Sequence, residues 1–564
     1  MRLQTNHKVF LFIFIIITAF NGCAEKPDVL YINGKIYTMS KDNKVAEAVA
    51  VKDGKILETG STSDLSDKYK PEETIDLKGA TVLPGFIDSD GSVFEFSKNL
   101  NYINLSFAKS LDEIKQLIID RTKLASEGEW IGGYGYNENV LTDEDYQKFD
   151  KFLLDQIAPN FNVYIVNNTF SAALLNSRAL RVLNINKDTK SPAGGEIDKD
   201  DNGELTGLLF DESVNLVRDN MPGQLKNEIT AQLERGVKEI LKYGITQVHD
   251  RSVSKEGIDI IRELIDANKF PLKIYAVLSG EDNTLIDFYL NKGTEISYKD
   301  RLTVRSITVD YDGLIEYQKA VIYEDYKNDP KKSLPYLSDN DILSLFNRAA
   351  DKNFQFSIKA VGDKAVTNSL NIIESVTKQK NLNDARTILG YCEMVDAKDI
   401  SRFGELKVIP SVRPDLTMTD VQITEQLISA DALKKVGLWN SLLKSSGMIV
   451  TASDFPVQQI NPFVQIYYLT TRQQTDTAVI TGINTDQKIS ILDAVRSYTV
   501  WPAYSSFEEN TKGSIETGKV ADMIVISNDI FNIDSRELLN TKVIRTIING
   551  SIVYEDKNLL SAGK

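Results

Sequence analysis

ATVLPGFIDSDGSVFEF, residues 80–96, is the stretch that decides the fold. It reads as a buried apolar strand that ends on Asp88, Asp90 and Ser92. Carboxylates at the end of a barrel strand normally belong to a functional site, because the loops at that face carry the chemistry. Yet this cluster contains no histidine. Two alternatives follow: a catalytic mouth, or a mouth whose usual ligands have been exchanged.

Further apolar runs predict a barrel. They are separated by segments with helical periodicity, such as DILSLFNRAADK. Eight strand–helix units predict an α/β fold, a (β/α)8 TIM barrel with parallel strands. The gap between the first two strands is too long for one crossover, so an insertion is expected at about 93–230. The eight predicted strands are 81–88, 245–250, 272–278, 302–310, 354–360, 387–392, 406–412 and 448–454.

Both ends of the chain have a different pattern. VLYINGKIYTM, VAVKDGKILETG and KVIRTIINGSIVYED join alternating strands through Asn-Gly or Asp-Gly turns. They predict one composite β-sandwich domain, formed by residues 24–82 and 505–564, beside a barrel domain of residues 83–504.

The composition limits the partners. The chain has 564 residues, which suggests at least two domains. With 65 Lys and Arg against 80 Asp and Glu, its net charge is −15, so nucleic acid is not expected as a partner. Histidine occurs only at His7 and His249.

The N-terminus reads as a processing segment. A polar and basic start, MRLQTNHK, precedes the short apolar run VFLFIFIIITAF and then Cys23. We expect a signal peptide at residues 1–22 and a lipid on Cys23, which would anchor the protein to a membrane of the bacterial cell envelope. The alternative is a simple cleaved signal. With Cys23 acylated, Cys392 has no disulfide partner, and His249 is the one histidine of the mature chain.

Ten motifs in order carry a family resemblance, among them VLPGFIDSDGS, GITQVHD, VDYDG, AVGDKAV, TASDFPV and KGSIETGKVADMIVI. Over roughly residues 28–556 the chain resembles the metal-dependent amidohydrolase superfamily, in its family 3 branch, which includes N-acyl-amino-acid and formamide hydrolases. The resemblance implies one or two divalent metals at the C-terminal mouth of the barrel. Four histidines, a carbamylated lysine and an aspartate hold them in the family.

The same resemblance locates the family's ligand positions in this chain. Asp90 and Ser92 stand at the two histidines of the first strand, and Thr308 stands at the lysine. Lys359 and Tyr391 stand at two further histidines, and only Asp454 is retained. Five of the six positions are therefore changed, and we expect no metal cofactor.

Our first hypothesis is that a salt-bridge network replaces the metal. Asp90, Lys359 and Asp454 would face one another across the mouth, with the ammonium between the two carboxylates. Tyr391 and Thr308 would add hydroxyl hydrogen bonds. The alternative is a degenerate pocket in which these side chains point elsewhere.

The second hypothesis is an altered enzyme. Oxygen donors at Asp90, Ser92, Thr308, Tyr391 and Asp454 suit one hard divalent ion such as Mg²⁺ or Ca²⁺, although Lys359 would repel it. Asp454 would then be catalytic. A metal-free route through Lys359 as base or nucleophile needs a lowered pKa, which two neighbouring carboxylates oppose.

Two other residues have open roles. His249 is either a ligand contact at the mouth or a structural hydrogen-bonding group at a strand end. Arg413 either binds a carboxylate of a ligand or pairs with a surface acid.

The sequence thus predicts a cell-envelope lipoprotein of the amidohydrolase fold, without metal-dependent hydrolysis, that binds a small amide-like or amino-acid-derived molecule. The competing class is an active hydrolase of non-peptide C–N bonds. A structural envelope protein with a filled barrel is the third alternative.

Overall fold

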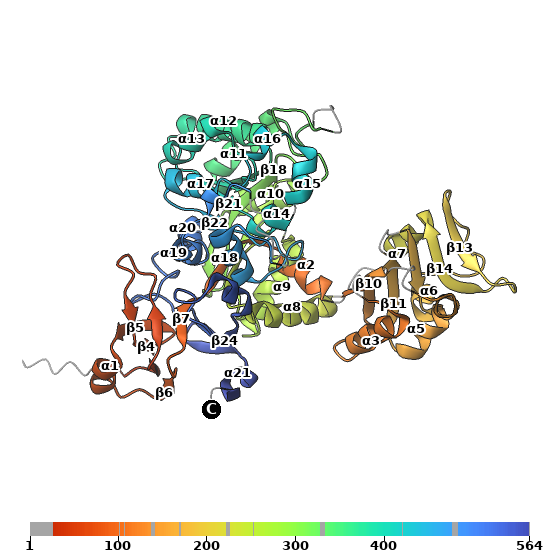
Figure 1. Cartoon of the computed structure of the whole chain (residues 1–564), viewed down its shortest axis with the longest axis horizontal. Coiled ribbons are helices and arrows are strands. Elements are labelled where there is room, and N and C mark those ends of the chain that lie inside the picture. The colour runs from red at the N-terminus through yellow and green to blue at the C-terminus, as the bar shows by residue number, and fades with distance from the viewer. Residues whose placement is uncertain are drawn as a thin grey trace, which may run out of the picture.

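The structure, a computed structural model, describes residues 26–562 apart from 101, 106–107, 137–140, 168–170, 221–225, 252, 328–332, 420 and 476–482. The predicted signal peptide and Cys23 lie outside these residues. A central barrel carries an insertion on one side and two further sheets on the other (Figure 1). Within the described ranges, no helix has both the length and the apolarity that a membrane span needs.

Eight parallel strands form the barrel, in the order β8-β15-β16-β18-β19-β20-β21-β22. Each corresponds to one predicted strand, so the predicted TIM-barrel-like α/β fold is confirmed. The short strand β17 (Glu295–Tyr298) pairs antiparallel with β18. The barrel strands are β8 (Phe86–Gly91), β15 (Ile245–Arg251), β16 (Lys273–Ser279), β18 (Leu302–Asp310), β19 (Gln355–Ala360), β20 (Ile388–Tyr391), β21 (Ile409–Val412) and β22 (Val450–Thr451).

The first predicted strand is in fact two strands. Thr81–Pro84 forms β7, which pairs with β2 (Lys35–Tyr37) and β23 (Met523–Ile526) outside the barrel. Only Phe86–Gly91 enters the barrel as β8. Pro84 lacks a backbone donor, which suits it to the end of a strand, and the chain changes sheets there.

The barrel closes between β8 and the segment that follows β22. The backbone N–H of Asp454 donates to the carbonyl of Asp90 at 2.8 Å, and that of Ser453 donates to Asp88 Oδ1 at 3.2 Å. Gly91 permits this approach, since a Cβ there would come within 2.2 Å of the Phe455 ring. The closure brings the first and last strand ends together.

The helices follow from their caps and apolar spacing. Ser254 Oγ accepts from the N–H of Gly257 at 3.0 Å and starts α9 (Lys255–Asp266), whose Ile258, Ile261 and Ile265 are buried three or four residues apart. The other helices of the barrel are α2 (Val93–Asn99), α8 (Lys226–Leu241), α10 (Asn283–Lys292), α11 (Asp339–Asp351), α12 (Asp363–Lys380), α13 (Ile400–Glu405), α14 (Pro414–Thr419), α15 (Val421–Leu427), α16 (Ala430–Leu433), α17 (Trp439–Ser446), α18 (Pro462–Thr471), α19 (Ile491–Arg496) and α20 (Val500–Ser505).

Two sheets lie near the chain ends. One has the order β5-β4-β1-β6, and the other, β25-β24-β23-β7-β2-β3, combines strands from both termini. The expected sandwich of the two sheets stays a prediction. Their remaining strands are β1 (Val29–Ile32), β3 (Val45–Ala46), β4 (Ala48–Lys52), β5 (Lys55–Gly60), β6 (Glu73–Asp76), β24 (Val543–Ile548) and β25 (Ser551–Glu555), with helices α1 (Thr62–Lys68) and α21 (Lys557–Ala562).

The insertion is a separate sheet with its own core, to the right of the barrel in Figure 1. Its strand order is β13-β14-β12-β11-β10-β9. The flanking helix α2 lies against α8 of the barrel, so the first residues after 93 belong to the barrel. The elements of the insertion are β9 (Tyr102–Asn104), β10 (Trp130–Tyr136), β11 (Asn162–Asn167), β12 (Ala172–Leu175), β13 (Gly195–Lys199), β14 (Leu205–Asp211), α3 (Leu111–Thr122), α4 (Asp143–Gln147), α5 (Lys151–Ile157), α6 (Ser177–Val182) and α7 (Asn215–Asn220).

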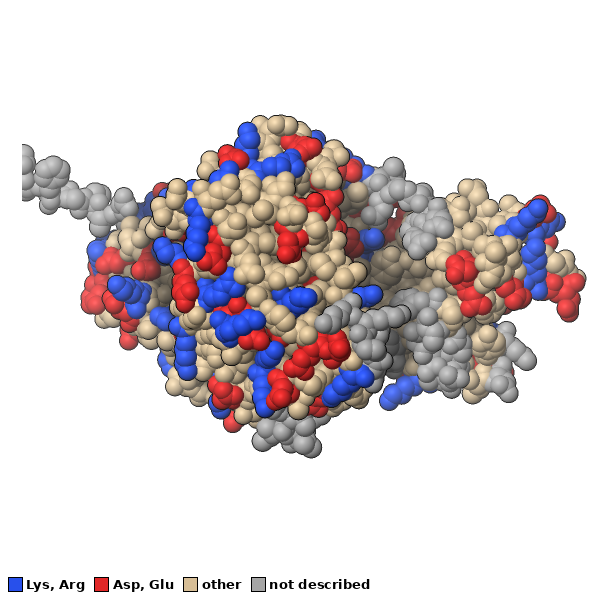
Figure 2. Space-filling view, turned by 90° about the horizontal axis from the view of Figure 1, so that it is seen from above, with Lys and Arg blue, Asp and Glu red and all other residues tan. Residues whose placement is uncertain are grey.

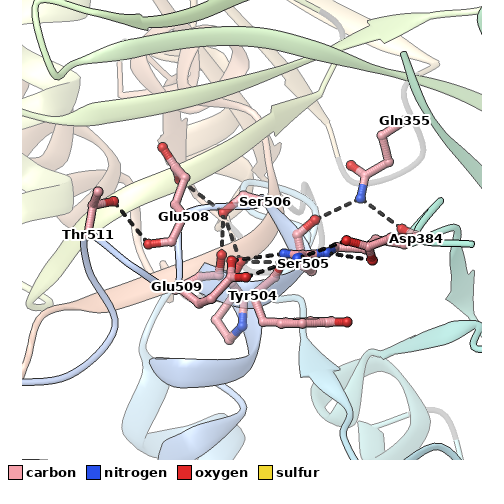
Figure 3. Close-up of polar contacts among 11 residues, drawn as sticks. Gln355, Asp384, Tyr504, Ser505, Ser506, Glu508, Glu509 and Thr511 are labelled. Atoms are coloured by element: carbon pink, nitrogen blue, oxygen red, sulfur yellow. Dashed lines mark hydrogen bonds and ion pairs between the residues drawn. The ribbon is translucent and has the colours of Figure 1, made fainter. Parts of the chain in front are cut away.

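A network of polar side chains lies at the N-terminal end of the barrel. Glu508 accepts from Gln247 at 2.7 Å and from Lys512 at 2.9 Å. It also accepts from Ser506 at 2.9 Å, a contact that Figure 3 shows. Beside it, Arg386 pairs with both oxygens of Glu509 at 2.8 and 2.9 Å. We call these residues the base network: Gln247, Arg386, Ser506, Glu508, Glu509 and Lys512.

Charge on the visible surface is mixed. Figure 2 shows acidic and basic side chains interspersed over the barrel, in spite of the net charge of −15. The acidic excess is therefore not gathered into one patch on that face.

Candidate functional site

The C-terminal mouth of the barrel holds a cluster of charged side chains. Asp90 lies near the end of β8, Arg251 ends β15 and Lys359 lies near the end of β19. Arg413 follows β21 and Asp454 follows β22. All five come from strand ends of the same face, where loops of a barrel carry function.

Arg251 joins the two carboxylates. Its Nε lies 3.0 Å from Asp90 Oδ1, and its Nη2 pairs with Asp454 Oδ1. Lys359 Nζ lies 3.2 Å from Asp90 Oδ2, and Arg413 Nη2 pairs with Asp454 Oδ2. We call these residues the mouth cluster: Asp90, Arg251, Lys359, Arg413 and Asp454.

This geometry corrects the predicted network in one respect. Lys359 was expected between Asp90 and Asp454, but it pairs with Asp90, and no ion pair of the described residues joins it to Asp454. The guanidinium of Arg251 takes that central position instead. A planar fork of donors can contact two carboxylates at once, which a single ammonium does less well.

Tyr391 contacts two cations through its ring. Arg413 Cζ lies 4.1 Å and Lys359 Nζ 5.0 Å from the centre of its ring. The expectation was a hydroxyl hydrogen bond, whereas the contact that the structure provides is through the ring face. Such cation–π contacts hold the two basic side chains in place without neutralising them.

The mouth cluster is mostly buried. The side chains of Lys359, Arg413 and Asp454 are at most 5% exposed, whereas Arg251 is 18% exposed and borders the opening. Burial raises the pKa of Asp90 and Asp454, and the guanidinium groups of Arg413 and Arg251 oppose that rise. Burial lowers the pKa of Arg251, but the surrounding acids outweigh it and raise that pKa overall.

Asp310, at the end of β18, is a third carboxyl at the mouth. Burial raises its pKa to about 6, and Arg251 only partly offsets this effect. At pH 7 it is therefore mostly ionised, and below about pH 6 it becomes neutral.

Several donors of the mouth cluster keep unused hydrogen-bonding capacity. Lys359 Nζ, Arg413 Nε and Arg413 Nη1 are buried and have no hydrogen-bond partner among the described residues. Unmet buried donors of this kind are costly unless something binds them. The mouth can therefore donate hydrogen bonds to an oxygen-rich group of a ligand.

His249 lies one layer below the mouth cluster. It is 2% exposed, two residues before Arg251 on the same face of β15, and its ring lies 4.9 Å from that of Tyr275. Burial lowers its pKa to about 4, so the imidazole is neutral at pH 7. His249 and Lys359 both line a cavity of about 30 Å³, which has room for a water molecule or two. His249 is thus an interior residue, and its Nε2 has no partner among the described residues. Its two expected roles, a ligand contact or a structural hydrogen-bonding group, stay predictions.

Two other predicted site residues lie away from the ion pairs. Ser92 caps α2, with its Oγ accepting from the N–H of Glu95 at 3.4 Å. Thr308 lines the cavity beside His249, with its hydroxyl unpartnered in the described structure. Neither belongs to the mouth cluster.

Arg251 and Asp310 were missed from the sequence. The second strand was expected to end at Asp250, but β15 extends to Arg251. The signal was available, because alternation places Arg251 on the same face as His249, and Asp310 on the same face as Thr308.

Comparisons with known proteins show the family of the chain. Residues 73–554 match the amidohydrolase family. YtcJ of Bacillus subtilis is 28% identical, over 93% of this chain and 99% of its own length. N-substituted formamide deformylase of Arthrobacter pascens is 25% identical, over 94% of this chain and 98% of that protein.

A solved structure shows the same fold. An uncharacterized metal-dependent hydrolase of Pyrococcus furiosus superposes with a TM-score of 0.70 at 22% identity, over 89% of this chain and 100% of that one. Because the family match spans most of the sequence, this chain belongs to the amidohydrolase family, in its family 3 branch.

Proposed function

We propose that this protein is a non-hydrolytic, ligand-binding member of its family. One observation carries the proposal: Arg251 contacts both Asp90 and Asp454, the two carboxylates at family metal positions. The position between these acids is thus taken by a guanidinium.

The residues present do not fit a divalent metal. An ion between Asp90 and Asp454 would have to displace Arg251 and would be repelled by Lys359 and Arg413 as well. No group of three or more His, Cys, Asp or Glu in the described residues is arranged to hold a metal. The donor set suits a carboxylate or amide oxygen better than it suits a cation.

The ligand class follows from the free donors. Arg413 and Lys359 present N–H groups with no hydrogen-bond partner in the described part of the chain. Such groups favour a small amide-like or amino-acid-derived molecule whose oxygen they can bind. The proposal also includes the features expected at the ends of the chain, a lipid on Cys23 in the cell envelope and a sandwich of the two terminal sheets.

A second candidate is an active hydrolase of non-peptide C–N bonds. It is favoured by the relative named N-substituted formamide deformylase and by Asp310, whose pKa of about 6 suits a general base. In this alternative Asp454 would bind one divalent ion after movement of Arg251.

An assay distinguishes the two candidates. The purified protein is incubated with N-acyl amino acids and N-substituted formamides, with Zn²⁺, Mn²⁺, Mg²⁺ or Ca²⁺ and with EDTA, beside the Asp454→Asn variant. We expect no turnover above that of the variant, and binding of some of these compounds by calorimetry. Metal-dependent turnover that is lost in Asp454→Asn would overturn the proposal.

A further inference from the structure

A large aromatic pocket lies where the insertion meets the barrel. Its volume is about 860 Å³, within the range of pockets that bind small organic molecules. The barrel contributes Phe96 and Leu100 from the end of α2, and Pro456 from the loop after β22. The insertion contributes Tyr102, Tyr134 and Tyr164.

The tyrosine wall of the pocket is a built feature. The hydroxyl of Tyr164 donates to that of Tyr102 at 2.8 Å, and the two rings meet edge to face at 6.1 Å. Gly132 makes room for this arrangement, because a Cβ there would lie 2.6 Å from the Tyr102 ring. Tyr134, two residues further along β10, is 38% exposed and also lines the pocket. Aromatic side chains held in place in this way favour the binding of a ligand that itself contains an aromatic ring.

The charge of the lining selects among aromatic molecules. Lys98 is the one charged side chain that the described lining contains. Its contact with Glu95 is long, at 3.9 Å, and both side chains are about half exposed. Such a pair is weak in water, so the ammonium stays available to a ligand.

The pocket also borders the mouth cluster. Pro456 follows Asp454 by two residues, and the Phe455 between them packs edge to face on Phe96 at 5.4 Å. A molecule in the pocket therefore lies beside the rim of the barrel mouth.

We propose that this pocket binds an aromatic carboxylate, with its rings against the tyrosine wall and its carboxylate towards Lys98. The inference goes beyond the proposed function, since the pocket lies beside the mouth cluster and the argument uses none of the donors of that cluster.

The test uses 2-naphthylacetate as probe, with 2-naphthylacetamide and decahydro-2-naphthylacetate for comparison, and calorimetry on the purified protein. Replacing the carboxylate by the amide removes the charge, and saturating the rings removes the aromatic contact. We expect each change to weaken binding by about fivefold, the effect of roughly 1 kcal/mol.

The chain offers matched control variants. Tyr134→Ala is compared with Tyr146→Ala, since Tyr146 is 42% exposed in the same insertion but outside the pocket. Lys98→Gln is compared with Lys115→Gln, because Lys115 also pairs with an acid three residues earlier, Asp112. We expect Tyr134→Ala to weaken every aromatic probe, and Lys98→Gln to weaken the carboxylate alone, while both controls bind as the native chain does.

Three results would overturn the inference: no binding of 2-naphthylacetate, equal affinity for the carboxylate and the amide, or equal effects of the pocket and control variants. Thermal unfolding of each variant confirms that it is folded. This outcome can be told apart from the failure of the proposed function. Metal-dependent turnover would refute that function, but it would not change the difference in affinity between the Tyr134 and Lys98 variants and their controls.

Discussion

The two ends of the barrel both bury charged groups, but they use them differently. In the base network, Glu508 accepts from three donors and Arg386 uses both nitrogens of its fork on Glu509. In the mouth cluster, Lys359 and Arg413 keep N–H groups without hydrogen-bond partners among the described residues. A saturated network stabilises the fold, whereas spare buried donors are a property of binding sites.

The base network and the mouth cluster also differ in where their residues lie in the chain. Four members of the base network, Ser506, Glu508, Glu509 and Lys512, come from one short segment that follows α20. The mouth cluster takes one residue from each of five strand ends. The mouth therefore depends on closure of the whole barrel, and each of its ion pairs also reports on the fold.

The largest effect is expected for Arg251→Met. The change leaves Asp90 and Asp454 without the cation that joins them, so the free energy of unfolding should fall by roughly 3–5 kcal/mol. Urea denaturation followed by circular dichroism measures it. A loss under about 1 kcal/mol would mean that Arg251 is dispensable and that the mouth is not held by ion pairs.

A smaller effect is expected for His249→Gln, and it depends on pH. Burial lowers the pKa of His249 from 6.5 to about 4 in the folded chain. As the pH falls from 6.5 towards 4, the unfolded chain therefore binds a proton that the folded chain does not, and this favours unfolding. Between pH 7 and pH 5 the native protein should lose about 2 kcal/mol more stability than the variant.

The quantity to measure is the difference in the free energy of unfolding between the native chain and His249→Gln. Other buried groups change the stability in the opposite direction as the pH falls. Burial raises the pKa of Asp88 and Asp312 to about 7 and that of Asp310 to about 6, so these three acids stabilise the fold as the pH falls. These contributions are common to both proteins and cancel. Equal pH dependence of the native chain and the variant would show that His249 keeps its ordinary pKa in the folded chain.

The smallest effect is expected at the base network. Arg386→Met removes the pairs with Glu509, whose side chain is 30% exposed, and with Asp384, which is 56% exposed. Water can replace the lost contacts there, so the free energy of unfolding should fall by about 1 kcal/mol, with ligand binding at the mouth unchanged. A loss as large as that of Arg251→Met would erase the contrast between the two ends.

The sequence predicted the barrel well because strand–helix alternation is a local signal. Eight apolar runs correspond to the eight barrel strands, and Asp90, Lys359 and Asp454 lie at the mouth as their positions at strand ends required. The split at Pro84 was missed because an unbroken apolar run does not reveal that its two halves join different sheets.

The pairing of the charges could not be predicted in the same way. Which acid each cation reaches depends on strand register across the barrel and on side-chain length, and neither is a local property of the sequence. Alternation alone could have placed Arg251 at the mouth, but not between two acids. The pocket formed by α2 and the insertion was likewise beyond prediction, because it arises from two segments that pack only in the folded chain.

The most direct test of the central claim is the metal content of the purified protein. Cells are grown with Zn, Mn, Mg and Ca available, and the protein is analysed by elemental mass spectrometry beside Arg251→Met. With Arg251 between Asp90 and Asp454, the native protein should hold close to no metal per chain. One or two tightly bound ions per native chain would contradict the account and return the mouth to the metal-dependent chemistry of its family.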